Sequence, residues 1–251
     1  MNPAVELSGV SKTFRDFWMR PKVKAVDSLD LEIARGEVFG LLGPNGSGKS
    51  TTIKMILGLL SPDCGKVLLD GLNPRSVEAR RSLGYLPELS YLHPFLTAEE
   101  TLWYYAGLCS LDRRTARDRI SQLIAMAGLE QAARRAVGSF SKGMARRVAL
   151  ACALVGKPSI LVLDEPTSGL DPVSTSEVKT LVKTLSAAGI TILMTSHLLA
   201  DAGDVCDRVC ILDSGRKAAE GKVGELEGSL EQFFLSKVGE GRDFKVPEFL
   251  K

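Results

Sequence analysis

The chain has 251 residues, of which 45% are hydrophobic and 25% charged, and its formal net charge is +2. This length suits one large α/β domain or a domain with an inserted subdomain, and the ordinary composition excludes disorder and a nucleic-acid-binding tail. No apolar run approaches the roughly 18 residues of a membrane span, and residues 1–10 lack the pattern of a signal peptide, so we expect a cytoplasmic protein.

The first 42 residues predict three strands. Residues 29–33 alternate between aliphatic and acidic side chains, which indicates an antiparallel strand with one face in water, and residues 4–11 are its expected partner. Residues 38–42 form a short apolar run that is typical of a buried parallel strand. A further strand, followed by a turn, is expected at 67–69.

A phosphate-binding loop pattern, G-x-x-x-x-G-K-[ST], follows the strand at 38–42. It lies in the stretch Gly43, Pro44, Asn45, Gly46, Ser47, Gly48, Lys49, Ser50 and Thr51. An apolar helical stripe over 53–60 comes next, so the loop is expected between a strand and a helix. A glycine-rich turn with a chance Lys-Ser is the alternative, and the flanking elements disfavour it.

This loop predicts a nucleoside triphosphate site. Its glycines allow a tight turn that brings successive N–H groups to phosphate oxygens, and the new helix adds its positive end. Lys49 supplies a full charge to the β and γ phosphates, and Ser50 offers a hydroxyl to Mg²⁺.

Residues 87–157 have a helical pattern. Thr97 and Glu100 make a capping box, and two later apolar stripes, over 120–127 and 148–155, repeat at i, i+3, i+4 and i+7. The segment carries ten basic and six acidic side chains. A basic face toward an acidic partner or lipid headgroups is one interpretation, and a solvated helix surface is the other.

Buried strands return after residue 157. Continuous apolar runs at 160–163 and 190–195 are typical of central parallel strands, and a further strand at 209–212 ends in a turn. Asp171 and Pro172 open a helix between the first two strands. From about residue 221 the pattern is mixed and predicts little.

Two adjacent carboxylates, Asp164 and Glu165, follow the strand at 160–163. They are expected at the carboxyl edge, where α/β sheets bind ligands. In this position Asp164 would hold Mg²⁺, directly or through water, and Glu165 would orient and deprotonate an attacking water. A solvated turn is the alternative for the dipeptide alone, but the phosphate loop earlier in the chain favours catalysis.

The five cysteines form no C-x-x-C pair, and their odd number agrees with reduced thiols. Cys206 and Cys210 are close in sequence, but no second pair or nearby histidine completes a zinc site.

Three further segments carry a family resemblance. They are Phe140-Ser141-Lys142-Gly143-Met144, Asp164-Glu165-Pro166-Thr167-Ser168-Gly169-Leu170-Asp171-Pro172, and Thr195-Ser196-His197. In order and spacing these segments resemble the signature motif, the Walker B motif with the D-loop, and the H-loop of ATP-binding cassette (ABC) ATPases. The resemblance covers nearly the whole chain. It implies an α/β fold with a P-loop NTPase core, an antiparallel β subdomain and an inserted helical subdomain.

The resemblance also implies domain boundaries. One ABC ATPase domain is expected over 1–222, with its catalytic core at 1–86 and 158–222. The helical signature subdomain is expected at 87–157, and a C-terminal tail at 223–251.

ATP and Mg²⁺ are the implied ligands. Besides the loop from Gly43 to Thr51, Phe14 is expected to stack on adenine, although Phe17 and Trp18 are near enough to take that role, and Val26 adds an apolar contact. The implied metal ligands are Ser50, Asp164 and Glu88. Glu165 and His197 are the expected catalytic residues, with His197 aligning the γ-phosphate and the water.

Ser141 precedes a helix as an N-cap, so its hydroxyl, the Gly143 N–H and the helix dipole make an anion site. A γ-phosphate held by Lys49 does not need a second such site on the same subunit. The resemblance implies that Ser141, Lys142, Gly143, Met144 and Asp171 contact the nucleotide of a second copy in a head-to-tail dimer. An ordinary helix cap is the alternative, but it does not explain the glycine at 143.

Two positions depart from the family's commonest pattern. Glu88 stands where many relatives have a glutamine that contacts Mg²⁺, and it adds negative charge near the triphosphate. Lys142 and Met144 replace two residues of the usual signature, a variant that resembles bacterial exporter-type subunits.

The implied function is that of an exporter's ATPase subunit, peripheral on the inner face of the cell membrane. Its partners would be a second copy of the subunit and separate integral membrane subunits, with no nucleic acid. The alternatives are an importer subunit, or a soluble ABC ATPase in translation or DNA maintenance. The sequence shows one cassette and no heptad run, and no longer regulatory domain is evident after residue 221.

Overall fold

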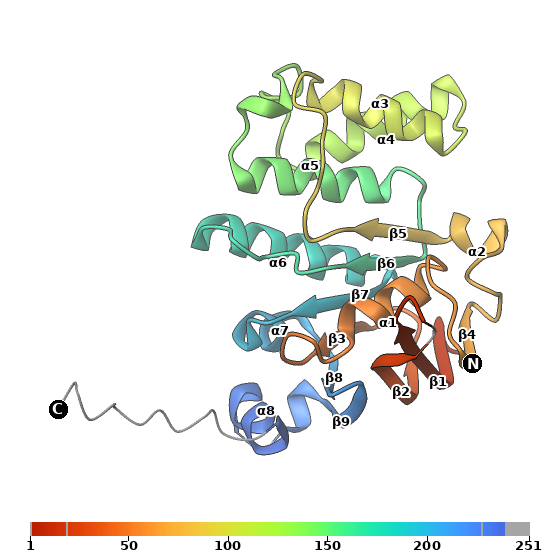
Figure 1. Ribbon diagram of the computed structural model, residues 1–251. Helices are drawn as coiled ribbons and strands as arrows, with labels where there is room; N and C mark the ends of the chain where they lie inside the picture. The colour runs from red at the N-terminus through yellow and green to blue at the C-terminus, as the bar shows by residue number, and fades with distance from the viewer. Residues whose placement is uncertain (1, 19, 227, 239–251) are drawn as a thin grey trace, which may run out of the picture.

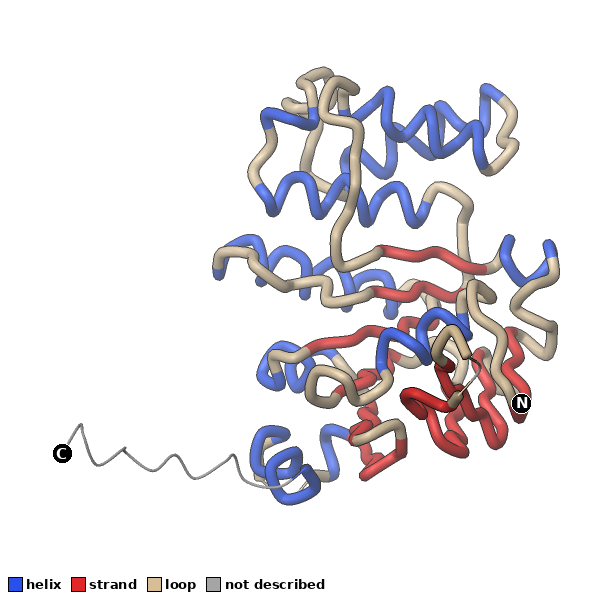
Figure 2. Tube along the Cα trace, viewed as in Figure 1, coloured by secondary structure: helices blue, strands red, loops and turns tan. Residues whose placement is uncertain are grey.

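The computed structural model describes residues 2–18, 20–226 and 228–238. A three-stranded antiparallel sheet lies beside a six-stranded, mainly parallel sheet, and a group of helices lies at one edge of the larger sheet (Figure 1). In Figure 2 this helical group stands at the opposite end of the molecule from the antiparallel sheet. In chain order the elements are β1 (Val5–Arg15), β2 (Pro21–Ile33), β3 (Val38–Leu42), α1 (Lys49–Ile56), β4 (Cys64–Leu69), α2 (Val77–Arg81), β5 (Leu83–Leu86), α3 (Ala98–Leu108), α4 (Arg113–Met126), the 3-10 helix η1 (Val137–Ser139), α5 (Lys142–Leu154), β6 (Ile160–Leu163), α6 (Pro172–Ala187), β7 (Thr191–Ser196), α7 (Leu199–Val205), β8 (Arg208–Asp213), β9 (Arg216–Lys222), the 3-10 helix η2 (Val223–Glu225) and α8 (Leu230–Val238).

The smaller sheet has the strand order β2-β1-β4 and is antiparallel throughout. Its first pair matches the one expected from the sequence, since Val5 lies opposite Ile33. Both strands are longer than predicted. Their outer ends bring Phe14 opposite Val23, close to the phosphate loop.

The larger sheet has the strand order β5-β6-β7-β3-β8-β9, and only β9 runs antiparallel to its neighbour. The three strands expected to end in site residues, β6, β7 and β3, are therefore adjacent. Leu42 at the end of β3 is in register with Ser196 of β7, and Leu163 of β6 with Met194. Their carboxyl ends meet at one edge of the sheet.

Both faces of the inner strands β6, β7, β3 and β8 are buried, which explains their continuous apolar runs. On β3, Phe39 and Leu41 join a core shared with α1 and the antiparallel sheet. Val38 and Leu42 join a second core, which α5, α6, α7 and α8 cover.

Helices α3, α4 and α5 enclose a third core of their own. The predicted capping box is present, since the Glu100 N–H donates to Thr97 Oγ1 at 3.1 Å and the Thr97 N–H to Glu100 Oε2 at 2.8 Å. Residues 87–97 are not helical, so the helical pattern predicted from residue 87 begins only at Ala98.

The described part of the C-terminal segment packs onto the core. Leu230 of α8 is buried in the second core, and Phe233 and Phe234 pack against it. The predicted tail beyond residue 238 lies outside the described residues. Among the residues that are described, no helix is both long and apolar enough to cross a bilayer.

Candidate active site

The phosphate loop joins the end of β3 to the start of α1. Gly43 has a φ of 148° and Gly48, the N-cap of α1, a φ of 107°, which residues with side chains rarely adopt. A Cβ at Gly43 would lie 2.3 Å from the Leu212 carbonyl oxygen, and one at Gly48 would lie 2.5 Å from that of Ala25. These two glycines therefore let the loop turn while it packs against β8 and β2.

Lys49 is the first residue of α1, and its side chain folds back over the loop. Its Nζ donates to the carbonyl oxygen of Gly43 at 2.6 Å and to that of Pro44 at 3.1 Å. Burial lowers the pKa of Lys49 below its usual range, and the charges of Glu165 and Asp164 oppose that shift. The Ser47 Oγ is buried and has no hydrogen-bond partner within the described residues.

A cavity of about 670 Å³ lies beside the loop. It is lined by Phe14, Lys22, Val23, Ala25, Asn45, Gly46, Ser47, Gly48, Lys49, Ser50, Thr51, Glu88, Asp164, Glu165 and His197. The structure thus brings most of the predicted site residues to one cavity. Lys22, Val23 and Ala25 were not predicted, because only the pairing of β2 with β1 places them there.

The aromatic and apolar residues expected near adenine are now placed. Phe14 lines the cavity and is 42% exposed. Phe17 and Trp18 do not line the cavity, and they are 91% and 72% exposed. Val26 is fully buried in the first core and does not line the cavity. Val23 and Ala25 of the same strand line the cavity in its place.

Thr195 of β7 holds the two carboxylates at the end of β6. Its Oγ1 donates to Asp164 Oδ1 at 2.7 Å and accepts from the Glu165 N–H at 3.0 Å. Glu165 has a φ of 48°, an uncommon conformation for a residue with a side chain. The turn after β6 therefore sends both carboxylates into the same cavity.

His197 and Glu165 are in direct contact. The His197 Nδ1 lies 2.7 Å from Glu165 Oε2, and the His197 backbone N–H donates to the same oxygen at 3.2 Å. The His197 side chain is half exposed, while that of Glu165 is largely buried. The contact orients the carboxylate from the neighbouring strand end.

Arg146 of α5 is a structural residue of the site that the sequence interpretation missed. Its guanidinium is buried and donates to the carbonyl oxygens of Asp164 and Glu165 at 2.8 Å and of Pro166 at 3.0 Å. It also donates to the Glu88 carbonyl oxygen at 3.0 Å. One side chain thus ties the helical group to the two loops that carry acidic residues.

The predicted trans-acting residues lie away from this cavity. Ser141 caps α5 by accepting from the Met144 N–H at 3.2 Å, and Asp171 caps α6 by accepting from the Val173 N–H at 3.0 Å. Ser141 and Lys142 are exposed, but Gly143 is buried. Of the five predicted trans-acting residues, none lines the cavity that holds Lys49.

The two cysteines considered for zinc, Cys206 and Cys210, are buried. Burial raises the pKa of both Cys206 and Cys210 to about 12, so their thiols stay protonated.

A glycine-rich loop between a buried strand and a helix, with acidic residues at the end of a nearby parallel strand, is the arrangement of a P-loop nucleoside triphosphatase. The comparison with protein families narrows this class. The family model described as "ABC transporter" matches residues 26–168, and the chain belongs to the ABC family of ATP-binding, ATP-hydrolysing subunits.

Individual relatives agree with this assignment. The chain is 39% identical over 247 residues to an uncharacterized ABC transporter ATP-binding protein of Nostoc sp., covering 96% of this chain and 72% of that protein. It is 44% identical over 227 residues to the Nod factor export ATP-binding protein I of Bradyrhizobium diazoefficiens, covering 90% of this chain and 72% of that protein. A solved ATP-binding cassette, dimeric in a post-hydrolysis state with ADP and Pi, superposes with a TM-score of 0.77 at 29% identity, covering 87% of this chain and 98% of that one.

Proposed function

We propose that this chain is the ATPase subunit of an ABC exporter and works as a head-to-tail dimer bound to separate membrane subunits at the cytoplasmic face. One observation carries the proposal. The cavity collects residues 45–51 of the phosphate loop, the carboxylates and His197, while Gly43, Pro44, Ser141 and Asp171 do not line it. This division supports a site that a second copy completes.

In the proposed complex ATP enters the cavity with its adenine on Phe14 and its phosphates on the loop from Gly43 to Thr51. Lys49 turns from the loop carbonyls to the β and γ phosphates, whose charge also offsets the cost of burying an ammonium group. The buried Ser47 hydroxyl and the loop N–H groups add neutral donors.

The oxygen donors that line the same cavity suit Mg²⁺. Ser50 offers a hydroxyl, and Asp164 and Glu88 offer carboxylates, which are the hard ligands this ion prefers. When bound, the ion would neutralise charge on the phosphates. Glu88 makes this ligand set more acidic than a glutamine would.

Glu165 is the proposed general base. Its carboxylate takes a proton from the attacking water, and the contact with His197 holds it in one orientation while the imidazole aligns the γ-phosphate. Thr195 fixes the backbone of Glu165 and the carboxylate of Asp164. In the dimer, the capped start of α5 at Ser141 supplies an anion site to the partner's γ-phosphate.

The export direction is supported by the relatives, several of which are Nod factor export ATP-binding proteins. An importer subunit would share the chemistry and differ in its membrane partner. A soluble ABC ATPase of translation or DNA maintenance is the other alternative. Purification from detergent-solubilised membranes, with identification of the membrane subunit that co-purifies, separates these. Exporter and importer subunits should bring down different membrane partners, and a soluble ATPase should bring down none.

The dimer is tested with Glu165→Gln. This change removes the base but keeps every phosphate contact, so we expect ATP binding without turnover and an ATP-dependent dimer on gel filtration. The matched control, Lys49→Ala combined with Glu165→Gln, should stay monomeric because its nucleotide affinity is lost. A Glu165→Gln protein that binds ATP and remains a monomer at every ATP concentration contradicts the proposal.

A further inference from the structure

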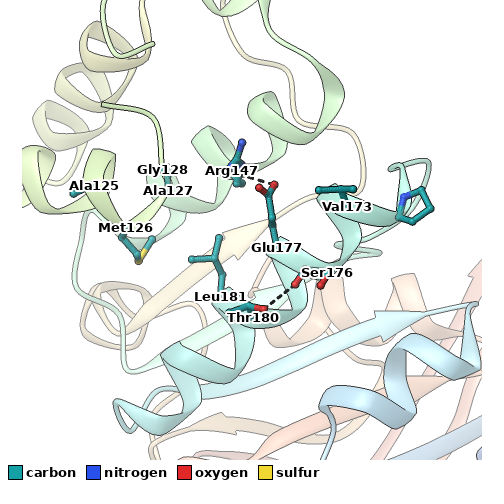
Figure 3. A pocket seen from close by; sticks show the side chains of 11 residues that line it. Ala125, Met126, Ala127, Gly128, Arg147, Val173, Ser176, Glu177, Thr180 and Leu181 are labelled. Carbon is teal, nitrogen blue, oxygen red and sulfur yellow. Dashed lines mark hydrogen bonds and ion pairs between the residues drawn. The ribbon is translucent and has the colours of Figure 1, made fainter. Parts of the chain in front are cut away.

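The junction of α5 and α6 joins the helical group to the catalytic core. A cavity of about 570 Å³ lies there, lined by residues of α4, α5 and α6. Figure 3 shows Arg147 of α5 and Glu177 of α6 pointing toward each other at its edge, and their Nη1 and Oε2 atoms are 3.4 Å apart. This ion pair is one of the contacts between the two helices.

A closer contact is between Gly143, one turn before Arg147, and Ser174, one turn before Glu177. A Cβ built at Gly143 would lie 2.1 Å from the Ser174 Oγ and 2.6 Å from its Cβ, and the next nearest atom would be 3.8 Å away. Ser174 cannot simply turn aside, because its Cβ is fixed by the α6 backbone. Its Oγ is also held by a 2.7 Å hydrogen bond to Asp171 Oδ2.

Backbone conformation does not explain the glycine at 143. Gly143 lies in the first turn of α5 and does not have a positive φ. Alanine is favoured over glycine in a helix by about 1 kcal/mol, so conformation alone would favour a side chain here. The requirement is one of space, and Ser174 of the same chain sets it.

We propose that Ser174 is a positioning residue that seats the first turn of α5 directly on the first turn of α6. The contact fixes Ser141 relative to Asp171, so the two capped helix starts are presented to a partner as one rigid surface. Gly143 is glycine because the helices touch at this point. The functional part of this inference rests on the proposed dimer, whereas the contact itself does not.

The contact is tested by thermal unfolding of Gly143→Ala, Ser174→Gly and the double variant. Overpacking should lower the Tm of Gly143→Ala by at least about 2 °C. In the Ser174→Gly background the same change should no longer lower the Tm, because the atoms at 2.1 and 2.6 Å are gone. Gly107→Ala, in α3 with nothing within 4 Å of the added Cβ, is the control and should not lose stability.

The positioning role is tested in the Glu165→Gln background by ATP-dependent dimer formation. Gly143→Ala should raise the protein concentration needed for half-dimerisation by about tenfold, while the ATP affinity of the monomer stays within about twofold. Adding Ser174→Gly should restore dimerisation to that of Ser174→Gly alone. A general loss of folding would also lower the ATP affinity of the monomer, so an unchanged affinity assigns the defect to dimer formation.

The outcomes separate the two proposals. If Gly143→Ala lowers the Tm equally in the protein with Ser174 and in the Ser174→Gly variant, the proposed contact between Gly143 and Ser174 is wrong. If Gly143→Ala combined with Ser174→Gly is folded and binds ATP but still fails to dimerise, the positioning role is wrong. Gly143 would then be needed for its contact with the partner copy and not for its contact with Ser174. If Glu165→Gln itself does not dimerise, the proposed dimer and the positioning role both fail, and the unfolding cycle still decides the contact.

Discussion

Thr195 connects the carboxylates of β6 to the neighbouring strand β7. Its hydroxyl contacts both the Asp164 side chain and the Glu165 backbone, and the threonine is fully buried. An isosteric methyl group in place of this hydroxyl removes one hydrogen bond from the Asp164 carboxylate and leaves the Glu165 N–H without its partner. The geometry of the base therefore depends on a residue that does not itself react.

We expect Thr195→Val to lower kcat for ATP hydrolysis by about tenfold, since hydrogen bonds to charged groups are worth about 1.5–3 kcal/mol. ATP affinity, measured by titration, should change little. Thr191→Val is the matched control, because Thr191 is a buried threonine at the other end of β7 and accepts from the Gly36 N–H at 2.9 Å. An equal fall in kcat in both variants would show a general effect on the strand.

The sequence predicts those site residues whose position depends on local structure. The phosphate loop and both carboxylates follow short apolar strands, and the patterns of those strands are unambiguous. Val26 was expected beside adenine, but its side chain lies in the first core, whereas its neighbour Ala25 lines the cavity. A difference of one residue along β2 thus separates the two environments. Sequence patterns alone do not fix that register.

At the scale of elements, Arg146 links α5 to the loops after β5 and β6. In the sequence it is one of several basic residues of a helix, and nothing in its local pattern distinguishes it from a solvated side chain. Its role follows from carbonyl groups that lie about twenty and sixty positions away in the chain. Long-range partners of this kind are the part of the site that sequence patterns did not predict.

Arg146→Met should lower the free energy of unfolding by about 3 kcal/mol in urea denaturation. The substitution keeps an apolar stem but leaves several buried carbonyl groups without a donor. Arg117→Met, at an exposed position of α4, should change stability by less than about 0.5 kcal/mol. Similar stability of the two variants would mean that water replaces the guanidinium.

At the scale of the whole molecule, α8 extends the second core beyond the boundary predicted at residue 222. Leu230, Phe233, Phe234 and Val238 form an apolar stripe at helical spacing that packs on the second core. The sequence interpretation did not use this stripe. Leu230 is 8% exposed, while Leu235 of the same helix is 47% exposed. The helix therefore belongs to the packed domain.

Leu230→Ala should cost about 2 kcal/mol of unfolding free energy, near the lower end for buried leucines because the site lies at the edge of the core. Leu235→Ala, the control on the same helix, should cost less than about 0.5 kcal/mol. Urea denaturation of both variants measures the difference. Equal, small losses would indicate that α8 contributes little to the stability of the domain.

The place of β3 in the sheet has a consequence for synthesis of the chain. Its two neighbours, β7 and β8, are encoded roughly 150 residues after it, so at about 5–20 residues per second a ribosome needs about 8–30 s to deliver them. During that time the strand, which is buried along its whole length in the folded protein, has neither of its sheet partners. The segment that leads into the phosphate loop is thus an aggregation-prone part of the nascent chain, and chaperones that cover apolar segments should bind it there.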